Sequence, residues 1–129
     1  MSEETGDLYK MENKQFAKEL EKRTRQFAVG IIHLSAKIPD TPEGRVVRNQ
    51  LTKCGTSVGA NYREANRSRS KADFRNRIEI CESEASETQY WLEIIRETAW
   101  LPREYVRPLY EECSQLLGIF TSIGKKAVK

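Results

Sequence analysis

The chain has 129 residues, of which 38% are hydrophobic and 32% are charged, and its net charge is +3. This length suits one domain with a single hydrophobic core. No apolar run approaches the roughly 18 residues of a membrane span, and three cysteines, an odd number, do not indicate a disulfide framework. We therefore expect a globular cytoplasmic protein without a membrane span.

The first predicted helix follows a tail. Residues 1–12 show no apolar periodicity and are predicted to form a disordered N-terminal tail. Asn13 is suited to cap the helix, and Pro39 and Pro42 predict where it stops. Apolar residues recur at helical spacing in between, with Thr24 at an intermediate position: Phe16, Leu20, Phe27, Ile31, Leu34 and Ile38.

The second helix is predicted from Thr41, as N-cap, with proline at the first position, to about Asn66. One face carries Val47, Leu51, Cys54, Val58, Asn61 and Ala65. Gly55 and Gly59 each cost about 1 kcal/mol relative to alanine, and they would let another helix approach closely. Asn61 is expected to be buried and hydrogen-bonded, fixing the helix register, or else to contact a ligand.

Two further helices complete the pattern. Ser70 followed by Asp73 resembles a capping box, and Pro102 is predicted to begin the last helix, which ends at Gly124 before a basic tail, residues 125–129. The third helix has the apolar face Phe74, Ile78, Cys81, Ala85, Thr88, Leu92 and Ile95, and the fourth has Val106, Leu109, Cys113, Leu116, Phe120 and Ile123. The expected fold is all-α: an up-down-up-down antiparallel four-helix bundle over residues 13–124.

Aromatic residues exceed what one narrow face per helix requires. Tyr90, Trp91 and Trp100 are the clearest examples. Such broad apolar faces belong either to the bundle core or to an oligomer interface.

Enzymatic chemistry is not indicated. His33 is the only histidine and has no matched nucleophile motif. The three cysteines, Cys54, Cys81 and Cys113, fall on three different helices without metal-ligand spacing, and Glu-x-x-His motifs of di-iron bundles are missing. We predict no catalytic residue, no metal and no cofactor.

An antiparallel hairpin turning near residue 68 places residues level when their numbers sum to about 136. Arg48 then lies within reach of Glu84 or Glu87, and a charge-assisted pair is predicted there. The same rule places Cys54 beside Cys81. It puts Asn61 level with Arg75.

Charge is distributed unevenly. Residues 43–77 hold nine Lys/Arg against three Asp/Glu, whereas residues 78–104 hold two against seven. Six cations surround the turn between the second and third helices: Arg63, Arg67, Arg69, Lys71, Arg75 and Arg77. They form either a solvated tip, a partner for the acidic third helix of a neighbouring subunit, or a contact for the backbone of RNA or DNA.

The run from Gln50 to Ala65 (QLTKCGTSVGANYREA), Asp73-Phe74 and the run from Glu84 to Leu92 (EASETQYWL) resemble a known family. It is the bacterial four-helix-bundle family encoded by intervening sequences within 23S rRNA genes, and the resemblance covers residues 14–124. The resemblance implies a homopentamer. It also implies similarity to the accessory bundle proteins of diversity-generating retroelements, which bind nucleic acid and a reverse transcriptase. No catalytic activity is established for the family.

Two functional hypotheses follow. In the first, a homo-oligomeric bundle binds RNA or DNA without sequence preference through phosphate contacts at the basic turn. In the second, the bundle is a protein-interaction or scaffold subunit, for example an accessory protein for a reverse transcriptase, with no nucleic-acid role.

Overall fold

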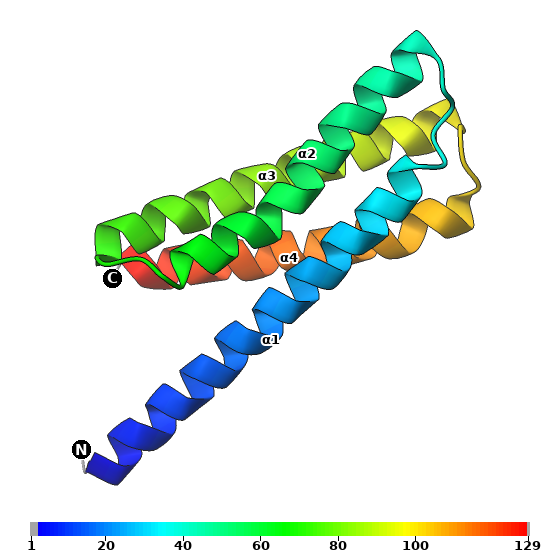
Figure 1. Cartoon of the computed structure of the whole chain (residues 1–129). Coiled ribbons are helices and arrows are strands. Elements are labelled where there is room, and N and C mark those ends of the chain that lie inside the picture. The colour runs from blue at the N-terminus through cyan, green and yellow to red at the C-terminus, as the bar shows by residue number, and fades with distance from the viewer. Residues whose placement is uncertain (1–2, 129) are drawn as a thin grey trace.

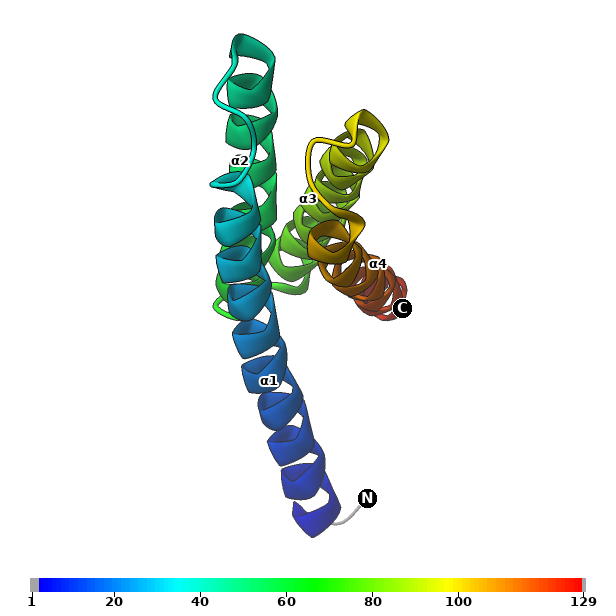
Figure 2. The ribbon, with the colours of Figure 1, turned by 90° about the vertical axis from the view of Figure 1, so that its right-hand side faces the viewer.

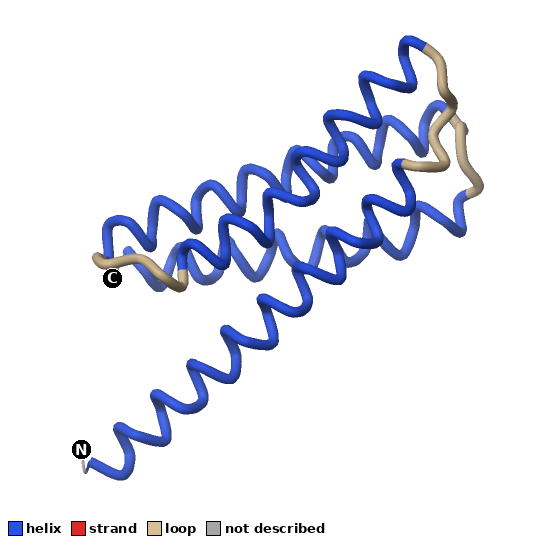
Figure 3. Tube along the Cα trace, viewed as in Figure 1, coloured by secondary structure: helices blue, strands red, loops and turns tan. Residues whose placement is uncertain are grey.

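The computed structural model describes the backbone of residues 3–128 and the side chains of residues 13–127. It contains four α-helices, α1 (Glu3–Ser35), α2 (Pro42–Ala65), α3 (Lys71–Thr98) and α4 (Arg103–Val128). Short connections join them, and consecutive helices run in opposite directions (Figures 1 and 3). Within the described range no strand occurs, so the predicted all-α antiparallel bundle is confirmed.

The predicted helix caps of α2 and α3 are both present. The Thr41 hydroxyl accepts a hydrogen bond from the Gly44 backbone N–H at 3.0 Å, and Pro42 occupies the first helical position. The Ser70 hydroxyl accepts from the Asp73 N–H at 3.1 Å. These caps satisfy orphan N–H groups and fix where the two helices begin.

The outer ends of the bundle differ from the prediction. Helix α1 begins at Glu3, ten residues before Asn13, and α4 continues past Gly124 to Val128. No proline separates residues 3–12 from the periodic region, and Lys125 and Lys126 favour a helix C-terminus through the helix dipole. Residues 3–12 and 125–128, predicted as tails, are therefore helical; residues 1–2 and 129 lie outside the described residues.

The predicted apolar faces form one core. Its fully enclosed members include Ile31, Leu51, Val58, Ile78, Leu92, Ile95, Leu116 and Phe120, together with the hydroxyl residues Thr24 and Thr88. The Thr24 and Thr88 hydroxyls donate to backbone oxygens of Leu20 and Glu84, so neither is left unpaired. Among the residues of the predicted faces, Asn61, Phe74, Leu109 and Ile123 are half-buried, and Phe16 is exposed over 51% of its surface.

Helices α1 and α2 approach each other closely at the two glycines. A Cβ atom built on Gly55 would lie 2.8 Å from Cγ2 of Ile31, and one on Gly59 would lie 2.9 Å from Oγ1 of Thr24. Both distances are shorter than van der Waals contact. The glycines therefore make the close helix contact that the sequence predicted.

Helix α1 leaves the bundle toward its N-terminus. Figures 1 and 2 show α1 running beside α2 over its C-terminal half and then diverging from α4. The contact between α1 and α4 is the smallest of the four helix contacts. Arg23 marks the point of separation, because it donates to Glu112 of α4 at 2.7 Å and to Gln115 at 2.6 Å. Phe16, seven residues before Arg23, keeps about half of its surface exposed.

None of the described helices combines the length and apolar character that crossing a membrane requires.

Replacement of Gly55 by alanine is expected to lower the free energy of unfolding. The new methyl group would overpack buried Ile31 at a cost of about 1–3 kcal/mol, which exceeds the roughly 1 kcal/mol that alanine gains in helix propensity. Gly118 is the matched control, because nothing lies within 4 Å of a Cβ built there. We expect the urea midpoint to fall for Gly55→Ala and to rise for Gly118→Ala. A rise for both variants would contradict the close helix contact.

Candidate nucleic-acid interface

The six predicted cations do gather at one end of the bundle, around the α2–α3 turn. The turn is short because the N–H groups of Arg67 and Ser68 bond back to Glu64 and Ala65, and Ser70 then caps α3 directly. Five of the six are exposed and Arg75 is half-buried. In chain order they are Arg63, Arg67, Arg69, Lys71, Arg75 and Arg77.

Two of these cations are engaged within the chain. Arg63 Nε lies 3.6 Å from a carboxylate oxygen of Glu21 on α1, and Arg77 Nη1 donates to the side-chain oxygen of Asn61 at 3.2 Å. Both links join neighbouring helices. Arg63 and Arg77 therefore contribute to the fold as well as to the surface charge.

The other four, Arg67, Arg69, Lys71 and Arg75, form no ion pair with any described side chain. Lys71 and Arg75 lie one helical turn apart on α3, where like charges repel slightly. No carboxylate among the described side chains pairs with either of them. An external anion would relieve the repulsion.

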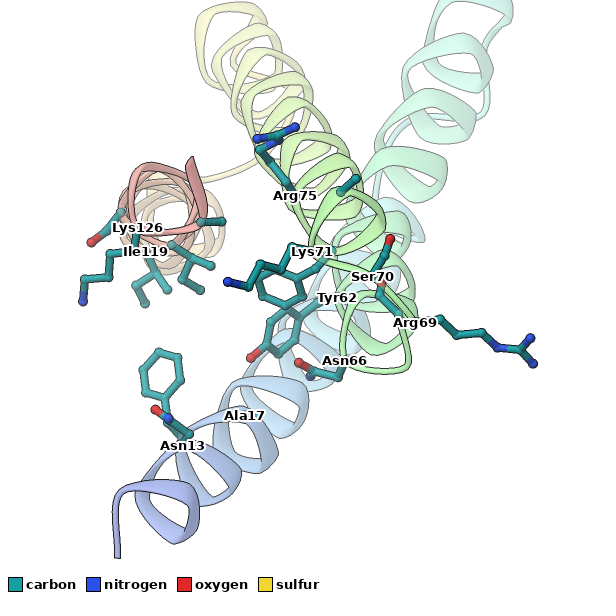
Figure 4. A pocket seen from close by; sticks show the side chains of 17 residues that line it. Asn13, Ala17, Tyr62, Asn66, Arg69, Ser70, Lys71, Arg75, Ile119 and Lys126 are labelled. Atoms are coloured by element: carbon teal, nitrogen blue, oxygen red, sulfur yellow. The ribbon is translucent and has the colours of Figure 1, made fainter. Parts of the chain in front are cut away.

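Three of the four unpaired cations also line an open groove between α1, the α2–α3 turn and α4. The groove has a volume of about 1440 Å³ and also contains Lys126 from α4. Figure 4 shows Lys71 extending into this space from α3, above Tyr62 and Asn66, whereas the Lys126 side chain lies at the α4 edge of the space and points away from Lys71. Its apolar lining includes Phe16, Tyr62, Phe74, Ile119 and Ile123.

Lys126 and Phe16 are site residues that the sequence reasoning missed. Lys126 was assigned to a tail, and Phe16 to the core, as the first residue of its periodic face. The topology contained a usable signal for Lys126, since in an up-down-up-down bundle the end of the fourth helix meets the turn between the second and third.

Asn61 was predicted to be buried, and this is wrong: it is half-buried. Its amide nitrogen donates to the Ser57 backbone oxygen at 2.8 Å, and its oxygen accepts from Arg77. The predicted hydrogen bonding is thus present. Its neighbour on α3 is Arg77 rather than Arg75.

The predicted pair of Arg48 with Glu84 or Glu87 is not formed. Arg48 Nη2 instead donates to the backbone oxygen of Ile38 at 2.6 Å, just past the end of α1, and its Nε is buried without a partner. Burial raises the pKa of Glu84, the nearby charge of Glu87 adds to the rise, and Lys53 lowers it. Glu87 accepts a long hydrogen bond, 3.5 Å, from the Trp91 indole N–H.

The α2–α3 register is shifted by two to three residues from the prediction, as the pairs Asn61–Arg77 and Val58–Cys81 show. The Sγ atom of Cys81 donates to the Val58 backbone oxygen at 3.5 Å, so Cys81 lies one turn beyond the predicted neighbour Cys54. Residues 66–68 continue the helical path of α2 whereas Ser70 is extended. The turn is therefore centred near residue 69 rather than 68.

The three cysteines are buried and free on α2, α3 and α4. Burial raises the pKa of Cys54 to about 11 and those of Cys81 and Cys113 to about 12. Such thiols stay protonated near neutral pH and act as small core residues.

The predicted interface aromatics differ in exposure. Tyr90 is 53% exposed, whereas Trp91 and Trp100 are half-buried and pack against the core. Tyr90 and Trp91 meet edge to face, with ring centroids 5.0 Å apart. Of the three, Tyr90 keeps the largest share of its surface for an outside contact.

Comparison with known proteins matches most of the chain to one protein family. The profile of the 23S rRNA-intervening sequence protein matches residues 17–122. A solved structure from Bacteroides thetaiotaomicron, a protein of unknown function from the S23 ribosomal protein family, is 34% identical, with a TM-score of 0.76 over 81% of this chain and 97% of that one. No curated protein matches the chain.

Substitution of Arg48 by methionine is expected to lower the free energy of unfolding by about 1–2 kcal/mol, because it removes a charge-assisted hydrogen bond to a half-buried carbonyl. Arg45→Met is the matched control. It removes an exposed pair with Asp40 and should cost less than about 0.5 kcal/mol. Urea denaturation measures both. If Glu84→Gln with Glu87→Gln proved as costly as Arg48→Met, an Arg48–carboxylate pair would have to be reinstated.

Proposed function

Because the chain belongs to the 23S rRNA-intervening sequence protein family, we propose that it is a non-enzymatic, homo-oligomeric bundle that binds the phosphate backbone of RNA or DNA. The contact surface is the basic α2–α3 turn, and the proposed setting is the cytoplasm. The family name links relatives to ribosomal RNA genes, and the solved relative is described as an S23 ribosomal family member. Both names are consistent with a nucleic-acid setting.

One observation carries the proposal: Arg67, Arg69, Lys71 and Arg75 lie together at one bundle end without an ion pair among the described side chains. Solubility does not require cations to be concentrated in this way. Each phosphate that a cation neutralises releases a counterion, and this release supplies most of the free energy of binding without sequence preference. The surface therefore suits a polyanion better than a single small anion.

Self-association would multiply this surface. Several copies of a weak site on one particle act together, because each further contact is made at high effective concentration. Large side chains remain exposed and available for contacts between copies: Val29, Ile32, Val46, Ile80, Tyr90 and Tyr105. The family resemblance implies five copies.

The same exposed apolar side chains favour a second candidate function. In it the bundle is a scaffold or accessory subunit for another protein, such as a reverse transcriptase, and binds no nucleic acid. An apolar protein interface depends weakly on salt, whereas phosphate contacts weaken steeply as salt rises.

Light scattering at micromolar concentration should report a mass near five times the 14.9 kDa of one chain. The physical reason is the exposed apolar surface around Tyr90, which self-association would remove from water. A monomer at that concentration would contradict the homo-oligomer and remove the avidity that it supplies.

Replacement of Arg67, Arg69 and Lys71 together by serine is expected to flatten the salt dependence of binding. Each phosphate contact contributes about 0.9 to the slope of log K against log salt, so the loss should be roughly two to three units if all three cations engage. The measurement is fluorescence anisotropy of a labelled oligonucleotide over a salt series. The free energy of unfolding should barely change, because exposed charges contribute little to stability.

The matched control replaces three exposed arginines at the opposite end of the bundle, Arg45, Arg103 and Arg107, with the same change in net charge. It should leave the slope close to the parent's. If both triple variants lowered the slope equally, net charge rather than the α2–α3 turn would be responsible. If the parent bound neither RNA nor DNA at low salt, the scaffold function would be favoured.

A further inference from the structure

The groove between the diverging part of α1 and the C-terminal half of α4 is lined by aromatic side chains as well as by cations. Phosphate binding at the basic turn does not explain the aromatic side chains. Phe16 projects from α1 with 51% of its surface exposed, although its periodic position matches that of the buried residues Leu20 and Phe27. Phe74 of α3 lines the same space and is half-buried. Two phenylalanines from different helices thus present ring surface to one open groove.

Among the side chains that the structure describes, the charged part of the lining has one sign. Arg69, Lys71, Arg75 and Lys126 line the groove, and none of the aspartates or glutamates between residues 13 and 127 does. The cations stand on both sides, three at the turn and the start of α3 and one on α4. This lining suits a ligand that carries both negative charge and a flat apolar surface.

Unpaired nucleotides have both properties. Every base has a flat face that stacks on an aromatic ring, and such stacking contributes about 1–3 kcal/mol per base with little sequence preference. In a duplex these faces are covered by neighbouring bases, so a duplex offers its phosphates and base edges but no free base face. Asn13, which also lines the groove, bears an amide that can donate to and accept from a base edge. The amide nitrogen of Asn66 already donates to Glu21 at 3.0 Å.

We propose that this groove is a single-strand site, in which an unpaired base stacks on Phe16 while Lys71, Arg75 and Lys126 bind the flanking phosphates. This inference rests on the proposed function and narrows it, since it makes single-stranded RNA or DNA the preferred ligand. The basic turn supplies the salt-dependent part of the affinity. The phenylalanine supplies a part that does not depend on salt.

The test compares a labelled oligothymidylate and oligouridylate with a duplex of equal length, by fluorescence anisotropy at several salt concentrations. Phe16→Ala and Phe16→Leu are expected to weaken single-strand binding about 5- to 150-fold, the equivalent of one stacked base, without changing the salt slope. Phe16→Trp should restore the affinity, and its added fluorescence should be quenched by the bound strand. Leucine keeps an apolar side chain but has no ring, so comparing Phe16→Leu with Phe16→Trp separates stacking from general hydrophobic contact.

Val46→Ala is the matched control, because Val46 is 57% exposed and lies on the first turns of α2, at the opposite end of the bundle. It should leave binding unchanged. Phe16 is itself exposed, so its variants should fold like the parent, which urea denaturation checks.

The possible outcomes separate this inference from the proposed function. Equal binding of single strand and duplex by the parent, unaffected by Phe16→Ala, would overturn the single-strand site and leave phosphate binding at the turn intact. If the parent bound neither single-stranded nor duplex nucleic acid, both the single-strand site and the proposed function would be overturned. If Phe16→Ala changed the mass found by light scattering, the groove would be a contact between copies of the chain, and the single-strand site would be overturned. Retained affinity in Phe16→Leu would also overturn stacking.

Discussion

The close contact between α1 and α2 determines the shape of the rest of the molecule. At Gly55 and Gly59 there is no side chain between the helices, so Ile31 and Thr24 of α1 lie directly against the backbone of α2. This contact holds the C-terminal half of α1 in the bundle. Closer to the N-terminus of α1, the facing residue of α2 is Tyr62 rather than a glycine. The Tyr62 ring packs edge to face on Phe120. Here α1 separates from α4, and the groove opens.

The bridge between α1 and α4 defines where this opening begins. Arg23 binds both oxygens of Glu112 in a two-pronged arrangement and also contacts Gln115. Such bidentate pairs fix geometry as well as supplying energy. On one side of the bridge, Gly30 allows Leu109 to pack closely against α1. On the other side, Ile119 and Ile123 face the groove without a covering helix. One ion pair therefore separates the closed half of the bundle from the half with an open, basic end.

The sequence was sufficient for those features that depend on local pattern. Apolar spacing identified the core of all four helices, and the caps at Thr41 and Ser70 followed from residue type at a fixed offset. Long-range polar contacts were not predictable in the same way. The hairpin rule assumed a symmetrical turn, and an error of two to three residues in register was enough to assign Asn61 to Arg75 instead of Arg77. Arg48 found a nearby backbone carbonyl, which no pairing of opposite charges would suggest.

The groove was unpredictable from periodicity for a different reason. Phe16 obeys the same spacing as Leu20, and only the direction of the helix axis decides which of them is covered. Axis direction depends on packing between whole helices, and a pattern along one helix carries no information about it. The sequence correctly predicted that the six cations gather at the α2–α3 turn. It placed Phe16, which lies beside them in the groove, in the core.

The structure divides the predicted cations by what they do. Arg63 and Arg77 are held by Glu21 and Asn61, so part of their charge is already used in joining helices. Arg69, Lys71 and Arg75 instead line the groove, and Lys126 joins them from α4. Part of the available charge thus lies on the open side of the bundle, where Lys71 extends into the groove, whereas the Arg69 guanidinium points away from it (Figure 4). A polyanion drawn to this end would meet the aromatic lining of the groove as well as the cations, and the two properties act on the same ligand.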